Sequence, residues 1–251
     1  MIEDSKKVLQ YAKDQGIQYF CACVSGGKDS ITALDVALKF VPIEMIVYID
    51  TTIGVPDTKE FVLGLQSKYR IPVVILTPKK SFEEIVLKEG FPRTPAHHII
   101  MIELKLKPLR SFKKYFKKPV AFISGTRKKE SKKRMTTAKA MSEFDGVKFV
   151  APLVNWSTPQ VFAYLKKNNL EVAPAYKKIH LSGDCLCGAN SQDAESEVIS
   201  LFYPDIANQI SRLECQLRKM QHPYWKWGNK GSMTGALTQK RLMPLCADCE
   251  I

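Results

Sequence analysis

No stretch of this sequence approaches the roughly 20 consecutive apolar residues that a membrane-spanning helix needs, although 45% of its 251 residues are hydrophobic. The N-terminal segment MIEDSKKVLQYAKDQG is charged and lacks the apolar core of a secretory signal. We therefore expect a cytoplasmic protein without membrane contacts, large enough for one catalytic domain and a small appended region.

Acidic residues are scarce as well, because 25 Asp and Glu face 38 Lys and Arg, which gives a net charge of +13. Much of the excess lies between Lys105 and Lys139. One interpretation is a solvated, lysine-rich surface. The other is an attractive field for an anionic substrate or nucleic acid. The sequence leaves both open.

Because the N-terminal segment lacks the features of a secretory signal, the seven cysteines argue against a disulfide framework. They are expected to be reduced, to bind metal or to take part in redox chemistry. Cys185 and Cys187 form a CxC motif, and Cys246 and Cys249 form a CxxC motif. Two such pairs suit a four-thiolate tetrahedral site for zinc or a [4Fe-4S] cluster. The site would bind the C-terminal tail to the rest of the protein.

Short apolar runs alternate with helical periodicity through the first two thirds of the chain. This pattern predicts an α/β fold with an open, mainly parallel twisted sheet and helices on both faces. We expect a nucleotide-binding domain over residues 1–180 and a helical, cysteine-bound region over residues 181–251. A loop is expected around His97 and His98. The expected strands are residues 17–24, 45–49, 72–76, 120–124 and 147–151.

The segment SGGKDS follows the first expected strand and opens a helix, where backbone N–H groups and the helix dipole bind phosphate. Its residues are Ser25, Gly26, Gly27, Lys28, Asp29 and Ser30. A Walker A loop would need Gly at position 22 and Ser or Thr at position 29, but the sequence has Ala22 and Asp29. P-loop kinases and GTPases are therefore excluded.

SGGKDS at this place resembles the PP-loop of the ATP pyrophosphatase superfamily, whose members cleave ATP between the α and β phosphates. The resemblance implies an adenine nucleotide alpha hydrolase-like fold and ATP bound with Mg²⁺. It also implies that Lys28 stabilises charge developing on the phosphates. Asp29 is expected to help hold the Mg²⁺ ion.

Further segments resemble the phosphoadenylyl sulfate (PAPS) reductase family of that superfamily. IDTTIGVPDT resembles the family's DTG segment, with Asp50 and Thr51 matching and Thr52 where Gly is usual. The resemblance implies that this loop lines the base and ribose. APLVNWSTPQVFAYL resembles a later block, in which Trp156 is expected to pack in the core.

The segment SGTRKKESKKR resembles the family's GxRxxES segment. Arg127 is expected to bind phosphate or sulfate, because its guanidinium suits planar, bidentate recognition. It completes a catalytic set with Lys28 and Asp29. The matching positions, all expected to bind nucleotide, are Gly125, Arg127, Glu130, Ser131 and Arg134.

The intact loop favours an ATP-consuming sulfurtransferase that adenylylates an acceptor, which can be tRNA or DNA, before sulfur from a donor displaces AMP. One alternative is a reductase that releases sulfite from PAPS or adenylyl sulfate with a thioredoxin-like reductant. Another is an accessory subunit that binds nucleotide without turnover. Several relatives carry a cluster on paired cysteines, so the resemblance favours [4Fe-4S] over zinc. An oligomer is compatible with all three.

Overall fold

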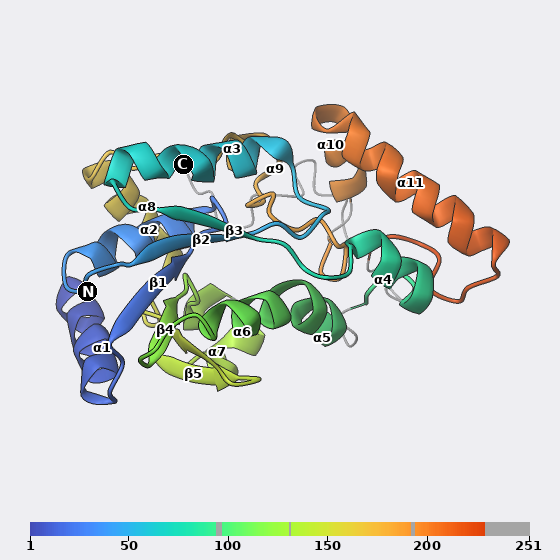
Figure 1. The fold of residues 1–251 in the computed structure, drawn as a ribbon. Coiled ribbons are helices and arrows are strands. Elements are labelled where there is room, and N and C mark those ends of the chain that lie inside the picture. Colours follow the sequence, from blue (N-terminus) through green and yellow to red (C-terminus); the bar gives the residue numbers. More distant parts are fainter. Residues whose placement is uncertain (94–96, 131, 192–193, 229–251) are drawn as a thin grey trace.

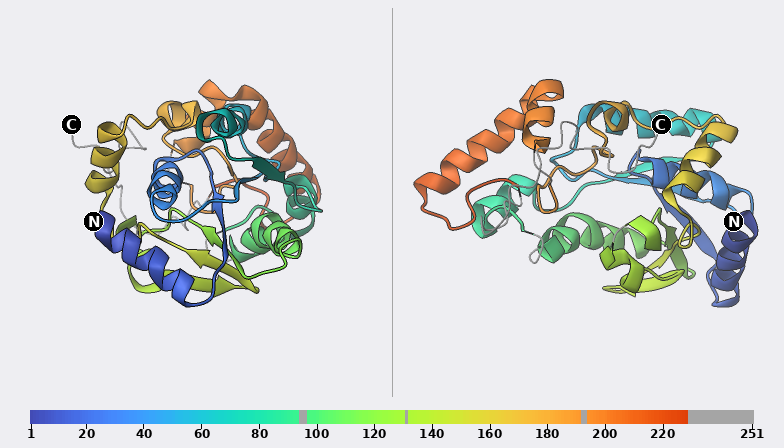
Figure 2. Two further views of the ribbon diagram at one scale, coloured as in Figure 1. Left: turned by 60° about the vertical axis from the view of Figure 1, so that its left-hand side comes forward. Right: turned by 180° about the vertical axis from the view of Figure 1, so that it is seen from behind.

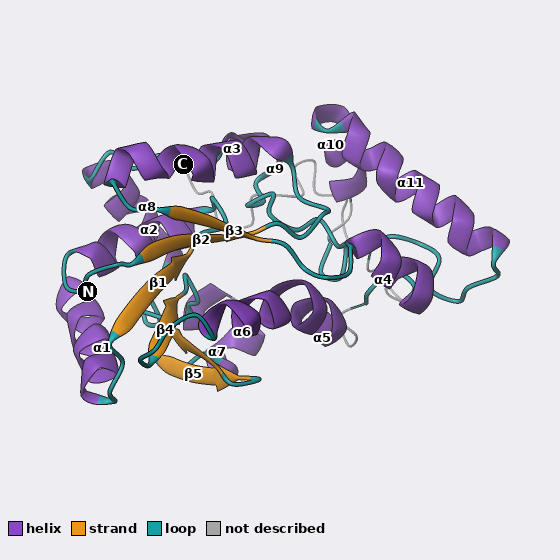
Figure 3. Cartoon of the chain, in the orientation of Figure 1, coloured by secondary structure: helices purple, strands orange, loops and turns teal. Residues whose placement is uncertain are grey.

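The computed structural model describes residues 1–93, 97–130, 132–191 and 194–228. Six strands form one twisted sheet in the order β3-β2-β1-β4-β6-β5, with helices on both faces (Figures 1 and 3). Neighbouring strands are parallel except β5 and β6, so the expected α/β fold is confirmed. The strands are β1 (Tyr19–Cys23), β2 (Met45–Ile49), β3 (Val73–Leu76), β4 (Val120–Ile123), β5 (Met141–Phe144) and β6 (Val147–Val150).

The helices join these strands by crossovers and add a helical C-terminal region. In Figure 1, α2 and α3 lie on one face of the sheet and α6 on the other. The described helices are α1 (Ile2–Asp14), α2 (Lys28–Leu38), α3 (Pro56–Tyr69), α4 (Phe82–Glu89), α5 (His97–Ile100), the π-helix η2 (Met101–Leu106), α6 (Lys107–Lys113), the 3₁₀-helix η3 (Lys128–Glu130), α7 (Lys132–Thr137), α8 (Thr158–Lys167), α9 (Pro174–Ile179), α10 (Glu195–Phe202) and α11 (Pro204–Lys219).

The strand order reverses direction at β1. The chain builds outward from β1 to β2 and β3, then returns to place β4 on the opposite side of β1. The carboxyl ends of β1 and β4 therefore flank a topological switch point, which is where open α/β sheets bind ligands.

Alternating side chains of β1 fill two separate cores. Phe20 and Ala22 pack with Leu34 of α2 on one face. Cys21 packs with Leu109 of α6 on the other. Burial raises the pKa of the Cys21 thiol to about 12, so this cysteine is a small apolar core residue.

Local sequence signals fix several helix starts. Ser81 and Glu84 form a capping box at α4, and Ser157 and Gln160 form one at α8. Pro56 occupies the first turn of α3, where its missing N–H costs nothing. These signals explain why the three helices begin where they do.

Two expectations about local structure need correction. The segment at His97 is helix α5 rather than a loop, because buried Ile100 and Leu104 lie four residues apart and pack as one helical face. Strand β5 was not expected. It pairs antiparallel with β6 through Asp145 and Gly146, which both have the positive φ that tight hairpin turns require.

The C-terminal helices α10 and α11 lie at one end of the molecule, beside α4 (Figures 1 and 2). Pro204 separates them, because α11 begins at this residue. Ile199 and Leu213 share a hydrophobic cluster with Ile53 and Phe82 from the N-terminal part of the chain. A domain boundary at residue 180 stays a prediction. None of the described helices is long and apolar enough to cross a bilayer.

Candidate functional site

The loop between β1 and α2 has the geometry of a phosphate cradle. Helix α2 begins at Lys28, and no side chain caps its N-terminus at Gly27. Gly26 has φ +79°, and a Cβ added there would lie 2.8 Å from Ala173 Cβ. Glycine is therefore required at position 26, and the first N–H groups of α2 can serve an anion.

Asp29 joins the two cations that the sequence assigned to catalysis. Its Oδ2 lies 3.0 Å from Lys28 Nζ, and its Oδ1 accepts a hydrogen bond from Arg127 Nε at 2.6 Å. The Arg127 side chain is only 1% exposed, whereas Lys28 and Asp29 are 17% and 19% exposed. The structure thus brings the catalytic set together, with Arg127 behind Asp29.

Arg127 is held by the segment that follows β6. Its Nη1 donates to the Trp156 carbonyl and to Thr158 Oγ1, each at 3.3 Å. A Cβ added to Gly125 would lie 2.6 Å from the Asp29 carbonyl carbon, so the turn after β4 packs directly on the start of α2. Trp156 is 1% exposed in the core, as predicted. Substrate binding by Arg127 and Gly125 stays a prediction.

The loop after β2 contains a strained threonine. Thr52 has φ 61°, in the left-handed region that favours glycine, and it stands where the DTG segment that it resembles has Gly. Two hydrogen bonds hold it there. Its N–H donates to Asp50 Oδ1 at 3.0 Å, and its Oγ1 accepts from the Phe82 N–H at 2.7 Å.

Thr51 is fully buried and donates to the Asp184 carbonyl at 2.5 Å. Leu186 N–H donates to the Ile53 carbonyl at 3.1 Å, and Val55 N–H donates to the Gly183 carbonyl at 2.8 Å. The loop that carries the CxC motif therefore lies against the loop after β2. Nucleotide binding by Asp50 and Thr51 stays a prediction.

Cys185 and Cys187, one residue apart, shift each other's pKa. The Cys185 thiol, through a hydrogen bond, holds the pKa of Cys187 below its ordinary value, and His97 adds to this effect. Burial and the same hydrogen bond raise the pKa of Cys185. The sequence spacing of His97 gave no indication of this effect.

The structure describes only two of the four cysteines of the predicted metal site. Cys246 and Cys249 lie outside the described residues, as does Ser131, and only the backbone elements of Glu130 and Arg134 are described. Within the described ranges, no group of three or more His, Cys, Asp or Glu side chains is arranged to hold a metal ion. Cys185 and Cys187 would supply two neighbouring thiolates, which fits half of a four-thiolate site.

A cavity of about 140 Å³ opens beside the phosphate loop, on the α6 face of the sheet. Its volume is below the roughly 300–1,000 Å³ of sites that hold a whole drug-sized ligand, so it suits one ring system of a larger molecule. Sequence reasoning missed two of its lining residues, Lys105 and Asp184. The lining comprises Cys23, Val24, Ser25, Val47, Tyr48, Ile49, Met101, Lys105, Leu106, Leu109, Phe149 and Asp184.

Lys105 Nζ and Asp184 Oδ2 form an ion pair at 2.8 Å. Burial alone would lower the pKa of Lys105, but the Asp184 carboxylate, with smaller contributions from Cys185 and Cys187, outweighs burial and the pKa is raised. Burial likewise opposes the charged form of Asp184, and the Lys105 ammonium still lowers its pKa. Both groups are therefore charged at neutral pH.

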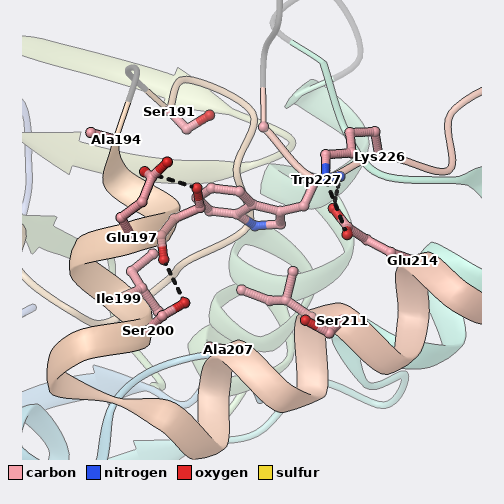
Figure 4. A pocket seen from close by; sticks show the side chains of 13 residues that line it. Ser191, Ala194, Glu197, Ile199, Ser200, Ala207, Ser211, Glu214, Lys226 and Trp227 are labelled. Carbon is pink, nitrogen blue, oxygen red and sulfur yellow. Dashed lines mark hydrogen bonds and ion pairs between the residues drawn. The ribbon is translucent and has the colours of Figure 1, made fainter.

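A larger cavity, of about 410 Å³, lies between α10, α11 and Trp227, and no residue of the phosphate loop lines it (Figure 4). The Trp227 indole separates it from the CxC loop, because Nε1 donates to the Leu186 carbonyl at 2.9 Å. Glu214 accepts from the Trp227 N–H at 2.9 Å and lies 3.4 Å from Lys226 Nζ. Although this cavity is larger than the one beside the phosphate loop, it lies apart from the predicted nucleotide-binding residues.

Residues 6–189 match the phosphoadenosine phosphosulfate reductase domain. An uncharacterized protein of Methanocaldococcus jannaschii is 26% identical over 81% of this chain, which spans 50% of that protein's length. The adenosine 5'-phosphosulfate reductase of Lysinibacillus sphaericus is 27% identical over 74% of this chain and 79% of its own length.

Solved structures share the fold at low sequence identity. PAPS reductase from Candida auris has a TM-score of 0.51 and 22% identity, covering 69% of this chain and 83% of its own. The U34-tRNA thiolase NcsA from Methanococcus maripaludis has a TM-score of 0.52 and 14% identity, covering 98% and 87%. The chain therefore belongs to the phosphoadenosine phosphosulfate reductase domain family, a family of PP-loop enzymes of sulfur metabolism.

Proposed function

We propose that this protein binds ATP with Mg²⁺ at residues 25–30 and cleaves it between the α and β phosphates to adenylylate an acceptor for sulfur transfer. The observation that carries the proposal is the uncapped N-terminus of α2 beside a ring-sized cavity. The cradle would hold the phosphates and the cavity the base, both at the switch point of the sheet.

In the proposed reaction an acceptor oxygen forms a bond to the α phosphorus. The bond between that phosphorus and the bridging oxygen breaks, and pyrophosphate leaves with the electron pair. A sulfur nucleophile from a donor then displaces AMP from the adenylylated acceptor. Lys28, now 3.0 Å from Asp29, would move its ammonium to the phosphates and stabilise their developing charge.

Arg127 has a positioning role in this proposal. Its buried guanidinium fixes the Asp29 carboxylate at 2.6 Å. Asp29 can then offer its remaining lone pairs to Mg²⁺ once Lys28 has turned to the phosphates, since carboxylate oxygen is a preferred Mg²⁺ ligand.

Cys185 and Cys187, together with Cys246 and Cys249, would hold a [4Fe-4S] cluster or a zinc ion. The CxC spacing supports this, since it places Cys185 and Cys187 one residue apart and a shared ion needs its ligands close together. NcsA, whose structure contains a [4Fe-4S] cluster, supports the cluster over zinc. A bound cluster would supply a site for sulfur or electron transfer.

Nucleic acid is the proposed acceptor class. The net charge of +13 would attract it, and the tRNA thiolase NcsA shares the fold over 98% of this chain. Some cations of the basic segment are already paired with acidic side chains of the same chain. Lys107 contacts Glu103 at 2.5 Å and Arg110 contacts Asp145 at 2.8 Å.

A second candidate function is reduction of adenylyl sulfate or PAPS to sulfite with electrons from a thioredoxin-like dithiol. The relatives named adenosine 5'-phosphosulfate reductase favour it. In this reaction a cysteine thiolate attacks the sulfur atom, AMP or adenosine 3',5'-bisphosphate leaves, and the dithiol reduces the resulting enzyme–sulfite adduct.

Product analysis separates the two functions. Anaerobically purified protein is incubated with Mg²⁺ and ATP, or with PAPS or adenylyl sulfate plus a dithiol, and the products are identified by mass spectrometry. The proposal expects AMP and pyrophosphate from ATP, lost in Lys28→Ala. Sulfite from either sulfonucleotide, with ATP intact, would replace it by the reductase function.

A further inference from the structure

We propose that Lys105 and Asp184 form the base-reading end of the 140 Å³ cavity and select an adenine base over a 6-oxopurine. The inference rests on the proposed function to the extent that it requires a purine nucleotide whose phosphates lie on residues 25–30. Neither the sequence motifs nor the family resemblance singled out this pair.

The cavity suits an uncharged ring better than a phosphate. Most of its wall is apolar, with contributions from Val24, Val47, Leu109 and Phe149 among others. Its charged lining residues are Lys105 and Asp184, which are paired with each other, so their charges cancel. A phosphate would gain little there, whereas a planar heterocycle would bury apolar surface and find one donor and one acceptor.

The donor and the acceptor are held in fixed positions. Asp184 Oδ2 lies 2.8 Å from Lys105 Nζ, and its Oδ1 accepts from the Ser182 hydroxyl. The Asp184 carbonyl accepts from Thr51, which anchors the backbone to the loop after β2. A pre-organised pair of this kind discriminates better than mobile side chains, because fixed groups cannot rearrange to suit a base with the wrong order of donor and acceptor.

Lys105 is presented by a rare backbone conformation. The segment Met101–Leu106 is a π-helix between α5 and α6. π-Helical turns are uncommon and occur frequently at functional sites, because their extra residue per turn reorients side chains at a cost in stability. This is independent support for a ligand role of a side chain on the segment.

Adenine matches the pair in a defined order. Its 6-amino group donates to Asp184, and the neighbouring ring nitrogen accepts from Lys105. A 6-oxopurine presents acceptor and donor in the opposite order along the same edge. Its carbonyl oxygen would therefore face the Asp184 carboxylate, and its ring N–H would face the Lys105 ammonium. A two-point match of this kind is worth about 1–3 kcal/mol, or roughly 5- to 150-fold in affinity.

The test compares affinities for ATP and inosine triphosphate by isothermal titration calorimetry of the full chain with Mg²⁺. Wild type should bind ATP at least roughly fivefold more tightly. Asp184→Asn should reverse or abolish this ratio, because Lys105 attracts the amide oxygen and leaves the NH₂ group facing the base. Lys105→Met should reduce the ratio toward one.

Lys107→Met is the control, since Lys107 lies two residues away and pairs with Glu103. It should keep the wild-type ratio. Partial misfolding of a variant lowers both affinities together and leaves the ratio unchanged, so only base recognition moves it. A wild-type ratio near one, or an unchanged ratio in Asp184→Asn, would overturn the inference.

The two proposals fail in different ways. If the ratio of ATP to inosine triphosphate affinity shifts as expected but the protein does not cleave ATP, base recognition by Lys105 and Asp184 is supported and the proposed function is wrong. Cleavage of ATP by a protein whose ratio does not respond to Asp184→Asn does the reverse. A wild type that binds no purine nucleotide overturns both.

Discussion

Arg127 and Asp29 lie 98 positions apart in the sequence, and the Arg127 Nε donates to Asp29 Oδ1 at 2.6 Å from a side chain that is 1% exposed. The contact joins the turn after β4 to the first turn of α2. It ties the two segments that flank the switch point of the sheet.

Removing this contact should destabilise the protein. Arg127→Met leaves the Asp29 carboxylate without its buried partner, and we expect a loss of about 3 kcal/mol in the free energy of unfolding. Arg127→Met and Asp29→Asn together should cost less than the sum of the two, with a coupling of roughly 1–3 kcal/mol. Urea denaturation measures all three variants.

Arg110→Met is the matched control. Arg110 also contacts a carboxylate, at 2.8 Å from Asp145, but its side chain is 47% exposed. Its loss should cost less than about 1 kcal/mol. Strictly additive costs for the Arg127 and Asp29 variants would show that the contact contributes nothing to stability.

Thr52 gives a prediction about backbone strain. Thr52→Gly relieves a left-handed conformation that costs about 1–2 kcal/mol but loses a hydrogen bond worth about 1 kcal/mol, so stability should stay within about 1 kcal/mol of wild type. Thr52→Val keeps the strain and leaves the buried Phe82 N–H without its acceptor. It should lose about 1–3 kcal/mol. A valine variant more stable than the glycine variant contradicts this account.

Trp227 should control the order of the CxC loop. Trp227→Phe removes the indole N–H that donates to the Leu186 carbonyl, which lies between the two cysteines. We expect faster amide hydrogen exchange over residues 183–188 and a loss of roughly 1–2 kcal/mol. Trp225→Phe is the control, because the Trp225 ring stacks on Arg218 instead, at 4.8 Å. Equal exchange in both variants would exclude the proposed support.

Metal analysis tests the cysteine assignment. Cys185→Ser and Cys187→Ser should each lose most of the iron that anaerobically purified wild type retains, because each removes one thiolate ligand. Cys215→Ser should retain it, since the exposed Cys215 lies on α11 and belongs to neither motif. Stoichiometric zinc in place of iron would support the cysteine ligands but show that the bound metal is zinc. Equal metal content in all three variants would show that neither Cys185 nor Cys187 is a metal ligand.

The sheet and the phosphate loop could be predicted because their signals are local. Apolar runs bounded by turns mark β1 and β2, and two adjacent glycines before Lys28 mark a close approach to phosphate. The hairpin between β5 and β6 was also marked, by Asp145 followed by Gly146, but β5 is short and half exposed and gives a weak strand pattern.

The polar contacts of the site could not be predicted because they are long-range. Lys105 and Asp184 are 79 positions apart, and neither lies in a recognised motif. The motif predicted that Arg127 binds phosphate or sulfate, but its burial behind Asp29 depends on the packing of the Trp156 segment. His97 affects Cys187, 90 positions away in the sequence, because α5 and the CxC loop pack in one hydrophobic cluster through Ile100 and Cys187.

The central claim is nucleophilic attack at the α phosphorus of ATP. The most direct measurement uses ATP labelled with ¹⁸O in the oxygen that bridges the α and β phosphates, incubated with anaerobic protein, Mg²⁺ and a tRNA pool, followed by mass spectrometry. The account predicts label in pyrophosphate and unlabelled AMP, with no turnover by Lys28→Ala. Label retained in AMP, or ADP as the product, would contradict it.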